Sequence, residues 1–183
     1  PQEFTEYNNE LFFRANDGIN GEELFKYNGD SVSLVANINA GIGNFSPQDF
    51  IEFNGELLFR ANDGISGYEL WKYDGSSISL IHDINTGSGD GSPNQFVEYN
   101  GSLFFNAYDS THGWELWQYN GATVSLVQDI YVGSGDASPG PFIVYNGNLI
   151  FSARDSINGR EIWMYDGTSV SLVQDIYTGV LGS

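Results

Sequence analysis

The sequence predicts an all-β protein, a β-propeller of four four-stranded antiparallel blades. Three observations predict this fold: a repeat of 46 residues, short apolar segments separated by turn dipeptides, and no segment with helical periodicity. A proline begins each repeat, and the blades are expected at 1–46, 47–92, 93–138 and 139–183, all within one domain. Four-stranded sheets at a period in the forties are typical of propeller blades.

The first two strands of a blade are expected to form a tight hairpin. In the second repeat, the stretch "DFIEFNGELLFRAND" contains two strands joined at Asn54-Gly55, a dipeptide that favours a two-residue turn because both central residues need positive φ. The turn predicts that Asp49 lies opposite Arg60 and pairs with it. The equivalent pairs are Glu3 with Arg14 in the first repeat and Gln95 with Asn106 in the third.

The last two strands are expected to form a second hairpin. The stretch "YELWKYDGSSISLI" contains Asp74-Gly75, and a turn there places Trp71 opposite Ile78. The same register pairs Trp117 with Val124 and Trp163 with Val170. Cross-strand pairs of an aromatic and a β-branched residue favour a core position between blades over an exposed platform for sugar stacking.

The apolar pattern also predicts that the array closes. Leu57 and Phe59 point to one side of their strand and Leu58 to the other, so the sheet is expected to lie between two neighbours. An open array needs polar outer faces on its terminal units, and the first and last repeats are as apolar as the others. We therefore expect a closed four-bladed ring and a monomer. The alternative is a homodimer, in which two chains form an eight-bladed ring.

Composition excludes several partners. A formal net charge of −18, from 24 acidic and 6 basic side chains, disfavours binding to nucleic acid or to an anionic membrane surface. No apolar run approaches the ~20 residues of a membrane span, so membrane insertion is not expected. The absence of cysteine leaves neither a disulfide nor a thiolate metal site. The chain starts at Pro1 without a signal-like segment, so a targeting segment is expected to be absent from it.

The frame "EIWMYDGTSVSLVQDI" from Glu161 recurs in every repeat. It resembles the bacterial repeat family named for its E-L-W-x-x-D-G-T motif, and the resemblance covers the whole chain. The first repeat departs from the motif at Phe25 and Asn28, and the third at Asn120. The resemblance implies a secreted or cell-surface bacterial protein and assigns no activity to any residue. The layout is also similar to kelch and hemopexin-type blades.

Acidic residues recur at positions that could bind Ca²⁺, the one cofactor that the sequence suggests. Carboxylates on glycine-rich loops are typical Ca²⁺ ligands, which points to Asp83 and Asp90 in "DINTGSGDGS". In a closed ring Glu6, Glu52 and Glu98 would gather near the axis. The alternative is that these carboxylates bond loop backbone or form a solvated rim. The acidic loop residue is missing from the fourth repeat, which has Gly182.

Positions where the repeats differ are the best candidates for ligand binding. The residue before the shared glutamate is Glu22, Tyr68, Trp114 or Arg160, and each is expected at a rim. Trp114 with His112 offers aromatic area, and Arg160 with Arg154 offers positive charge.

Catalytic chemistry has little support in the sequence. His82 and His112 occupy different places in the repeat and have no nucleophile at a recognisable spacing. The predicted function is therefore a non-enzymatic extracellular recognition or scaffold module that binds glycan or protein. A hydrolase or lyase acting on polysaccharide is one alternative, because glycosidases need only two carboxylates. A structural repeat without a ligand is another.

Overall fold

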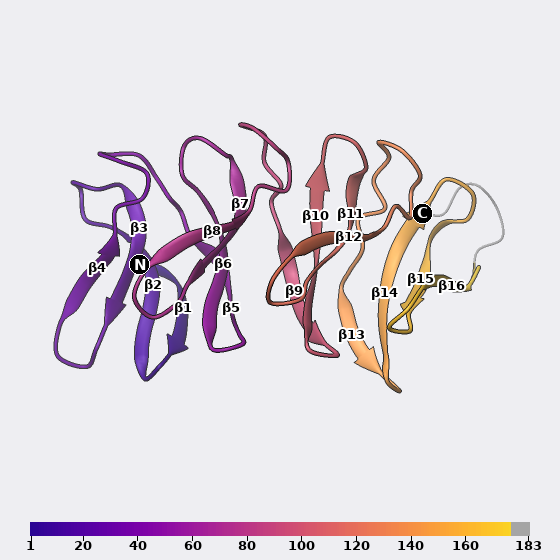
Figure 1. The fold of residues 1–183 in the computed structure, drawn as a ribbon, viewed down its shortest axis with the longest axis horizontal. Helices are drawn as coiled ribbons and strands as arrows, with labels where there is room; N and C mark the ends of the chain where they lie inside the picture. Colours follow the sequence, from indigo (N-terminus) through magenta and orange to yellow (C-terminus); the bar gives the residue numbers. More distant parts are fainter. Residues whose placement is uncertain (177–183) are drawn as a thin grey trace. The chain divides into compact units, whose positions relative to one another are not determined.

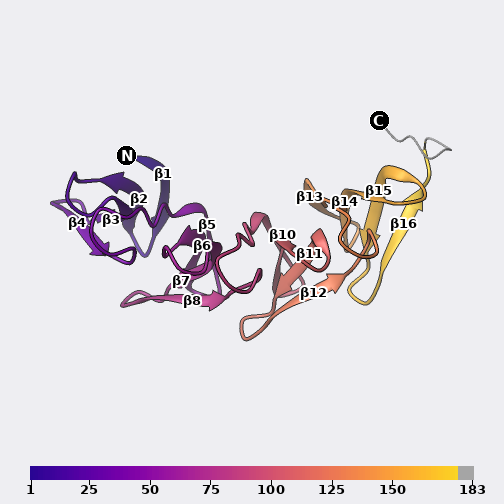
Figure 2. The ribbon, with the colours of Figure 1, turned by 90° about the horizontal axis from the view of Figure 1, so that it is seen from above.

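The computed structural model describes residues 1–176 and confirms the predicted fold class. It contains four four-stranded antiparallel sheets, one per repeat, and no helix within the described residues (Figure 1). The strands of each sheet lie side by side in chain order (Figure 2). No helix in this part of the chain is therefore long and apolar enough to cross a membrane.

The chain divides into two compact units, Pro1–Ser92 and Pro93–Ser183. Unit 1 holds blade 1, which consists of β1 (Gln2–Tyr7), β2 (Glu10–Asn16), β3 (Glu22–Tyr27) and β4 (Val32–Ala36). It also holds blade 2, which consists of β5 (Gln48–Phe53), β6 (Glu56–Asn62), β7 (Tyr68–Tyr73) and β8 (Ile78–His82).

Unit 2 holds the other two blades. Blade 3 consists of β9 (Asn94–Tyr99), β10 (Ser102–Asp109), β11 (Gly113–Tyr119) and β12 (Val124–Gln128). Blade 4 consists of β13 (Phe142–Tyr145), β14 (Asn148–Asp155), β15 (Gly159–Tyr165) and β16 (Val170–Gln174).

The core of each unit lies between its two sheets. In unit 1, Phe12 and Leu24 of blade 1 are fully buried against Phe59 and Trp71 of blade 2. We call the side of a blade that carries the Phe12 and Leu24 positions face A, and the side that carries the Phe59 and Trp71 positions face B. In unit 2, face A of blade 3 packs on face B of blade 4 in the same way, through Phe104, Leu116, Phe151 and Trp163.

The predicted two-residue turns are present. Asn54 and Gly55 have φ of 53° and 76°, and Phe53 pairs with Glu56 on either side of them. The turns at the same place in the other blades also have positive φ; they are Asn8-Asn9, Asn100-Gly101 and Asn146-Gly147. Glycine and asparagine tolerate this conformation, which explains why they occupy the turns.

The predicted register of the first hairpin is wrong by one residue at its far end. A β-bulge between Gln48 and Ile51 places Gln48 opposite Arg60, and Asp49 takes a positive φ of 55°. The side-chain pairing nevertheless holds, since Arg60 Nε lies 2.7 Å from Asp49 Oδ2.

The same shift occurs in blades 1 and 3. Gln2 lies opposite Arg14 and accepts a 2.6 Å hydrogen bond from it, in place of the predicted Glu3. Asn94 lies opposite Asn106, in place of the predicted Gln95. The bulge adds one residue to the outer strand, so a register counted from the turn fails beyond it.

The predicted register of the second hairpin is also wrong. Asp74 Oδ1 accepts hydrogen bonds from the backbone N–H groups of Ser76 and Ser77, both at 2.8 Å, and this stabilises a four-residue loop. Tyr73 therefore pairs with Ile78, and Trp71 lies opposite Leu80. Trp117 and Trp163 lie opposite Leu126 and Leu172, not Val124 and Val170. The expected burial of these tryptophans is confirmed.

We expect Trp71→Ala to lower the free energy of unfolding by about 3–5 kcal/mol, because it empties a buried position between two sheets. The Trp71 ring lies edge-on to Phe45 at 5.1 Å and is almost fully buried. Urea unfolding measures the loss. The control is Trp114→Ala, at a half-buried rim position, and we expect a much smaller loss there. Equal losses in the two variants would contradict the core assignment.

Candidate functional site

In blades 1 to 3, the variable residue before the buried glutamate is held by hydrogen bonds to its backbone. Tyr68 N–H donates to Asp90 Oδ1 at 2.9 Å, and Tyr68 C=O accepts from Ser92 N–H at 2.7 Å. Blades 1 and 3 hold Glu22 and Trp114 in the same way, with Asn44 and Ser46, and with Asp136 and Ser138. These bonds do not involve the variable side chain, so that side chain can change while its backbone stays fixed.

A buried glutamate anchors the connecting segment that makes these bonds. Glu69 is fully buried, and its Oε2 accepts from Ile84 N–H at 2.8 Å while its Oε1 accepts from Gly91 N–H at 2.7 Å. A Cβ at Gly91 would lie 2.5 Å from Glu69 Oε2, so a larger residue there requires the glutamate to shift. Glutamates at the same place bond the segments after the other blades; they are Glu23, Glu115 and Glu161.

Burial changes the titration of these glutamates. Removal from water raises the pKa of Glu23, Glu69 and Glu115 to about 7, and their backbone hydrogen bonds offset only part of that effect. The protonated form is therefore favoured in the folded chain at pH values where a solvated glutamate is ionised.

A polar hollow lies beside Tyr68 in unit 1. It has a volume of about 300 Å³ and is lined by Gln48, Arg60, Tyr68, Asp90 and Ser92. Arg60 is oriented by two partners, since its Nη2 donates to Gln48 Oε1 at 3.0 Å and its Nε lies near Asp49. We call these five lining residues the blade 2 rim pocket.

The structure thus brings together two residues that the sequence predicted for different roles. Tyr68 was predicted to bind a ligand and Asp90 to bind a metal, and both line the blade 2 rim pocket. The prediction missed Gln48 as part of this site because it did not include the β-bulge. The equivalent position in blade 1 is filled by its own ion pair, as Arg14 Nε lies 3.8 Å from Glu22 Oε2.

The other predicted ligand residues lie in unit 2 and do not form one site. Trp114 packs against Tyr108, with ring centroids 5.9 Å apart. His112 is turned toward its own loop, where Nδ1 lies 2.8 Å from Asp109 Oδ2, and this bond raises the pKa of His112.

Arg154 and Arg160 are cross-strand neighbours on β14 and β15, close together as the sequence predicted. Arg154 lies over the Tyr131 ring at 5.3 Å, a cation–π contact. Arg160 Nη1 donates to Ser152 Oγ and to Ser138 C=O, both at 3.1 Å.

Of the predicted Ca²⁺ ligands, Asp83 and Asp90 accept hydrogen bonds from backbone N–H groups. Asp83 Oδ2 accepts from Gly87 N–H at 3.1 Å, and Asp90 holds the Tyr68 backbone. Glu6, Glu52 and Glu98 are exposed on β1, β5 and β9, and the last of these lies in the other unit. Among residues 1–176, no three histidine, aspartate or glutamate side chains form a group that could hold a metal. The expected loop position at Gly182 lies outside the described residues.

Comparison with solved structures supports the fold. The chain is similar to the acylaminoacyl peptidase of Pyrococcus horikoshii, with 15% identity and a TM-score of 0.59 over 94% of this chain and 26% of that one. It is similar to the β-propeller domain of the Trilobed protease of Pyrococcus furiosus, with 11% identity and a TM-score of 0.59 over 94% of this chain and 54% of that one.

A puromycin hydrolase is similar as well, with 10% identity and a TM-score of 0.61 over 94% of this chain and 28% of that one. The chain therefore spans between about a quarter and about half of the proteins it resembles. No protein-family model and no curated protein matches it. These likenesses define the chain as blades of a β-propeller.

We expect the stability of the protein to fall as pH rises from about 4.5 to about 7, because three buried glutamates have folded-state pKa values near 7 and ordinary values of 4.5. Thermal unfolding across this range measures the fall. Glu69→Gln should make this pH-dependent fall in stability smaller. The same variant should also lower the free energy of unfolding by about 1–3 kcal/mol, because one oxygen that accepts a backbone N–H is replaced by an amide donor.

The matched control is Glu52→Gln, which removes the same charge from an exposed strand position. It separates burial of Glu69 from the general self-repulsion of a chain with a net charge of −18. Equal pH slopes in the two variants would contradict the role of burial.

Proposed function

We propose that the chain is a non-enzymatic recognition module that binds glycans outside the cytoplasm through the blade 2 rim pocket. This proposal rests on the fixed backbone of the residue before the buried glutamate in blades 1 to 3, which presents a different side chain in each of these blades. A scaffold that keeps its backbone constant while one rim residue varies is suited to recognition. The resemblance to E-L-W-x-x-D-G-T repeats supports the location.

The chemistry of the blade 2 rim pocket favours a sugar. Its lining residues supply an aromatic ring, a guanidinium, an amide, a carboxylate and a hydroxyl within a hollow of about 300 Å³. Sugar rings present hydroxyl groups around their edge and C–H groups on their faces, and these groups match polar side chains and an aromatic ring. A protein ligand is the other partner that the same groups could contact.

Polysaccharide hydrolysis has less support from this site. A glycosidase uses two carboxylates that flank the bond it cleaves. Asp90 is the one carboxylate among the residues that line the pocket, and its Oδ1 already accepts the Tyr68 N–H. The named activities of the similar peptidases and of the hydrolase belong to proteins of which the chain covers 26% to 54%.

We expect a glycan array to identify at least one bound neutral glycan, and Tyr68→Ala to raise its Kd about tenfold through loss of the stacking surface. Isothermal titration with the identified glycan measures the change. Ile65→Ala is the control, because Ile65 is exposed in the same blade and does not line the pocket. An array without binding, or unchanged affinity in Tyr68→Ala, would contradict the proposal.

A second substitution tests the backbone arrangement by itself. Tyr68→Arg copies the residue that blade 4 carries at this position. Because the backbone bonds to Asp90 and Ser92 do not involve the Tyr68 ring, we expect unfolding free energy to change by no more than about 0.5 kcal/mol. Glycan affinity should nevertheless fall. Large destabilisation would show that the ring, rather than the backbone bonds, holds this segment.

A further inference from the structure

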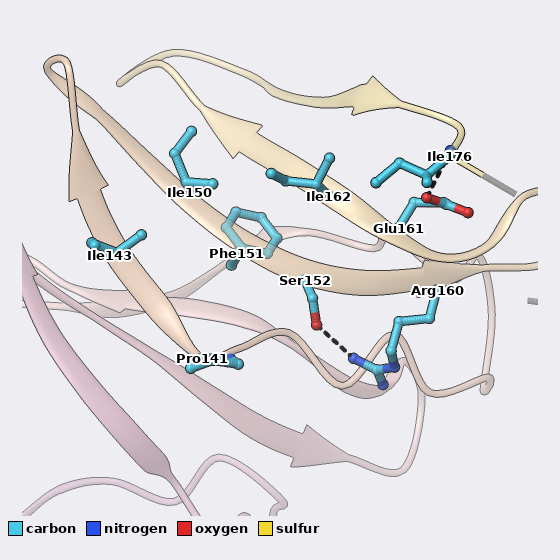
Figure 3. Close-up of a pocket in the computed structure, with 9 residues that line it drawn as sticks. All are labelled: Pro141, Ile143, Ile150, Phe151, Ser152, Arg160, Glu161, Ile162 and Ile176. Carbon is cyan, nitrogen blue, oxygen red and sulfur yellow. Dashed lines mark hydrogen bonds between the residues drawn. The ribbon is translucent and has the colours of Figure 1, made fainter. Parts of the chain in front are cut away.

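Within the described part of unit 2, no sheet covers face A of blade 4, and this face is apolar. Ile143, Ile150 and Ile162 line a hollow of about 360 Å³ on β13, β14 and β15, with Arg160 at its edge (Figure 3). Ile143 and Tyr145 on β13 are 61% and 63% exposed. Monomeric proteins rarely expose contiguous apolar surface of this kind without an interaction partner.

The same surface is covered in the first blade of each unit. Phe12 and Leu24 of blade 1 occupy the positions of Ile150 and Ile162, and both are fully buried by face B of blade 2. Phe104 and Leu116 of blade 3 are buried by face B of blade 4. The chain therefore shows twice which surface fits face A: it is face B of a following blade.

Blade 1 offers an uncovered face B. Phe4 and Tyr27 on this face are 60% and 38% exposed. Leu11 and Ala15 are half-buried, whereas the equivalent leucines and alanines of blades 2 and 4 are fully buried; those residues are Leu57, Ala61, Leu149 and Ala153. The exposed Phe4 ring continues a row formed with the rings of Phe13 and Phe25, which are themselves buried.

A repeated hydrogen bond defines how a face A and a face B meet. Tyr7 of blade 1 donates its hydroxyl to Gly55 C=O in the first turn of blade 2, at 2.7 Å. Tyr99 of blade 3 does the same to Gly147 C=O of blade 4, at 2.9 Å. Tyr145 occupies this position in blade 4, and the first turn of blade 1 offers Asn9 C=O.

We propose that face A of blade 4 binds face B of blade 1 from a second copy of the chain, so that two chains pair head to tail in one closed dimer. Each dimer then contains two such contacts, because the contact joins different surfaces and a ring must close. The chain spans 54% of the Trilobed protease propeller domain that it resembles, and two copies supply a ring of comparable length.

Light scattering and native mass spectrometry test the proposal. We expect the chain to have twice its mass of 20.2 kDa at micromolar concentration. Ile143→Glu blocks face A of blade 4 and Phe4→Glu blocks face B of blade 1, and both positions are exposed in the single chain. Each variant alone should be a monomer. An equimolar mixture should form a heterodimer, since one of its two contacts joins unchanged faces.

Ile65→Glu is the matched control, at an exposed isoleucine outside both faces, and it should remain a dimer. Circular dichroism confirms that each variant is folded. If a glutamate variant fails to fold, Tyr145→Phe provides the test, because loss of one hydrogen bond at each of the two contacts should raise the dimer Kd about tenfold to a hundredfold. A monomeric wild-type chain, a dimeric face variant or a mixture that stays monomeric would overturn the proposal.

Discussion

The arrangement of each blade depends on one interaction, the hydrogen bonds between a buried glutamate and the connecting segment that follows the blade. That segment is irregular and rich in glycine, so its N–H groups have no strand partner, and buried N–H groups need an acceptor. Glu69 provides two carboxylate oxygens for three of them, from Ile84, Asn85 and Gly91. The segment is thereby held against the third strand, and its Asp90 and Ser92 reach the Tyr68 backbone.

Because of this anchoring, the residues that pack the sheets together differ from the rim residues proposed for recognition. The middle strands supply the apolar faces that hold two sheets together, and substitution there leaves a cavity. In blades 1 to 3 the rim residue is held by backbone bonds, so glutamate, tyrosine and tryptophan are all compatible with the same local structure. The aspartates before it are structural as well, since Asp63 Oδ1 accepts two loop N–H groups, from Ile65 and Ser66. Many of the acidic side chains thus bond backbone N–H groups.

The fold could be predicted from the sequence because its signals are local and repeated. The 46-residue period and the Asn-Gly turns depend on neighbouring residues only. The predicted registers were wrong for two local reasons. Asp74 bonds Ser76 and Ser77 and lengthens the second turn. In the first hairpin, a backbone bulge at Asp49 shifts Gln48 by one position. The blade 2 rim pocket joins Gln48 to Ser92 through the fold, and no spacing rule predicts such a meeting.

The energy and the geometry of blade packing come from different groups. Apolar contact between two sheets is favourable but non-directional, so by itself it permits several relative positions. The Tyr7 hydroxyl reaches the Gly55 carbonyl only in one of them, and a buried hydroxyl left without a partner costs about 1–3 kcal/mol. Blade 3 repeats this bond through Tyr99. A few polar atoms therefore select the position in which the large apolar faces meet.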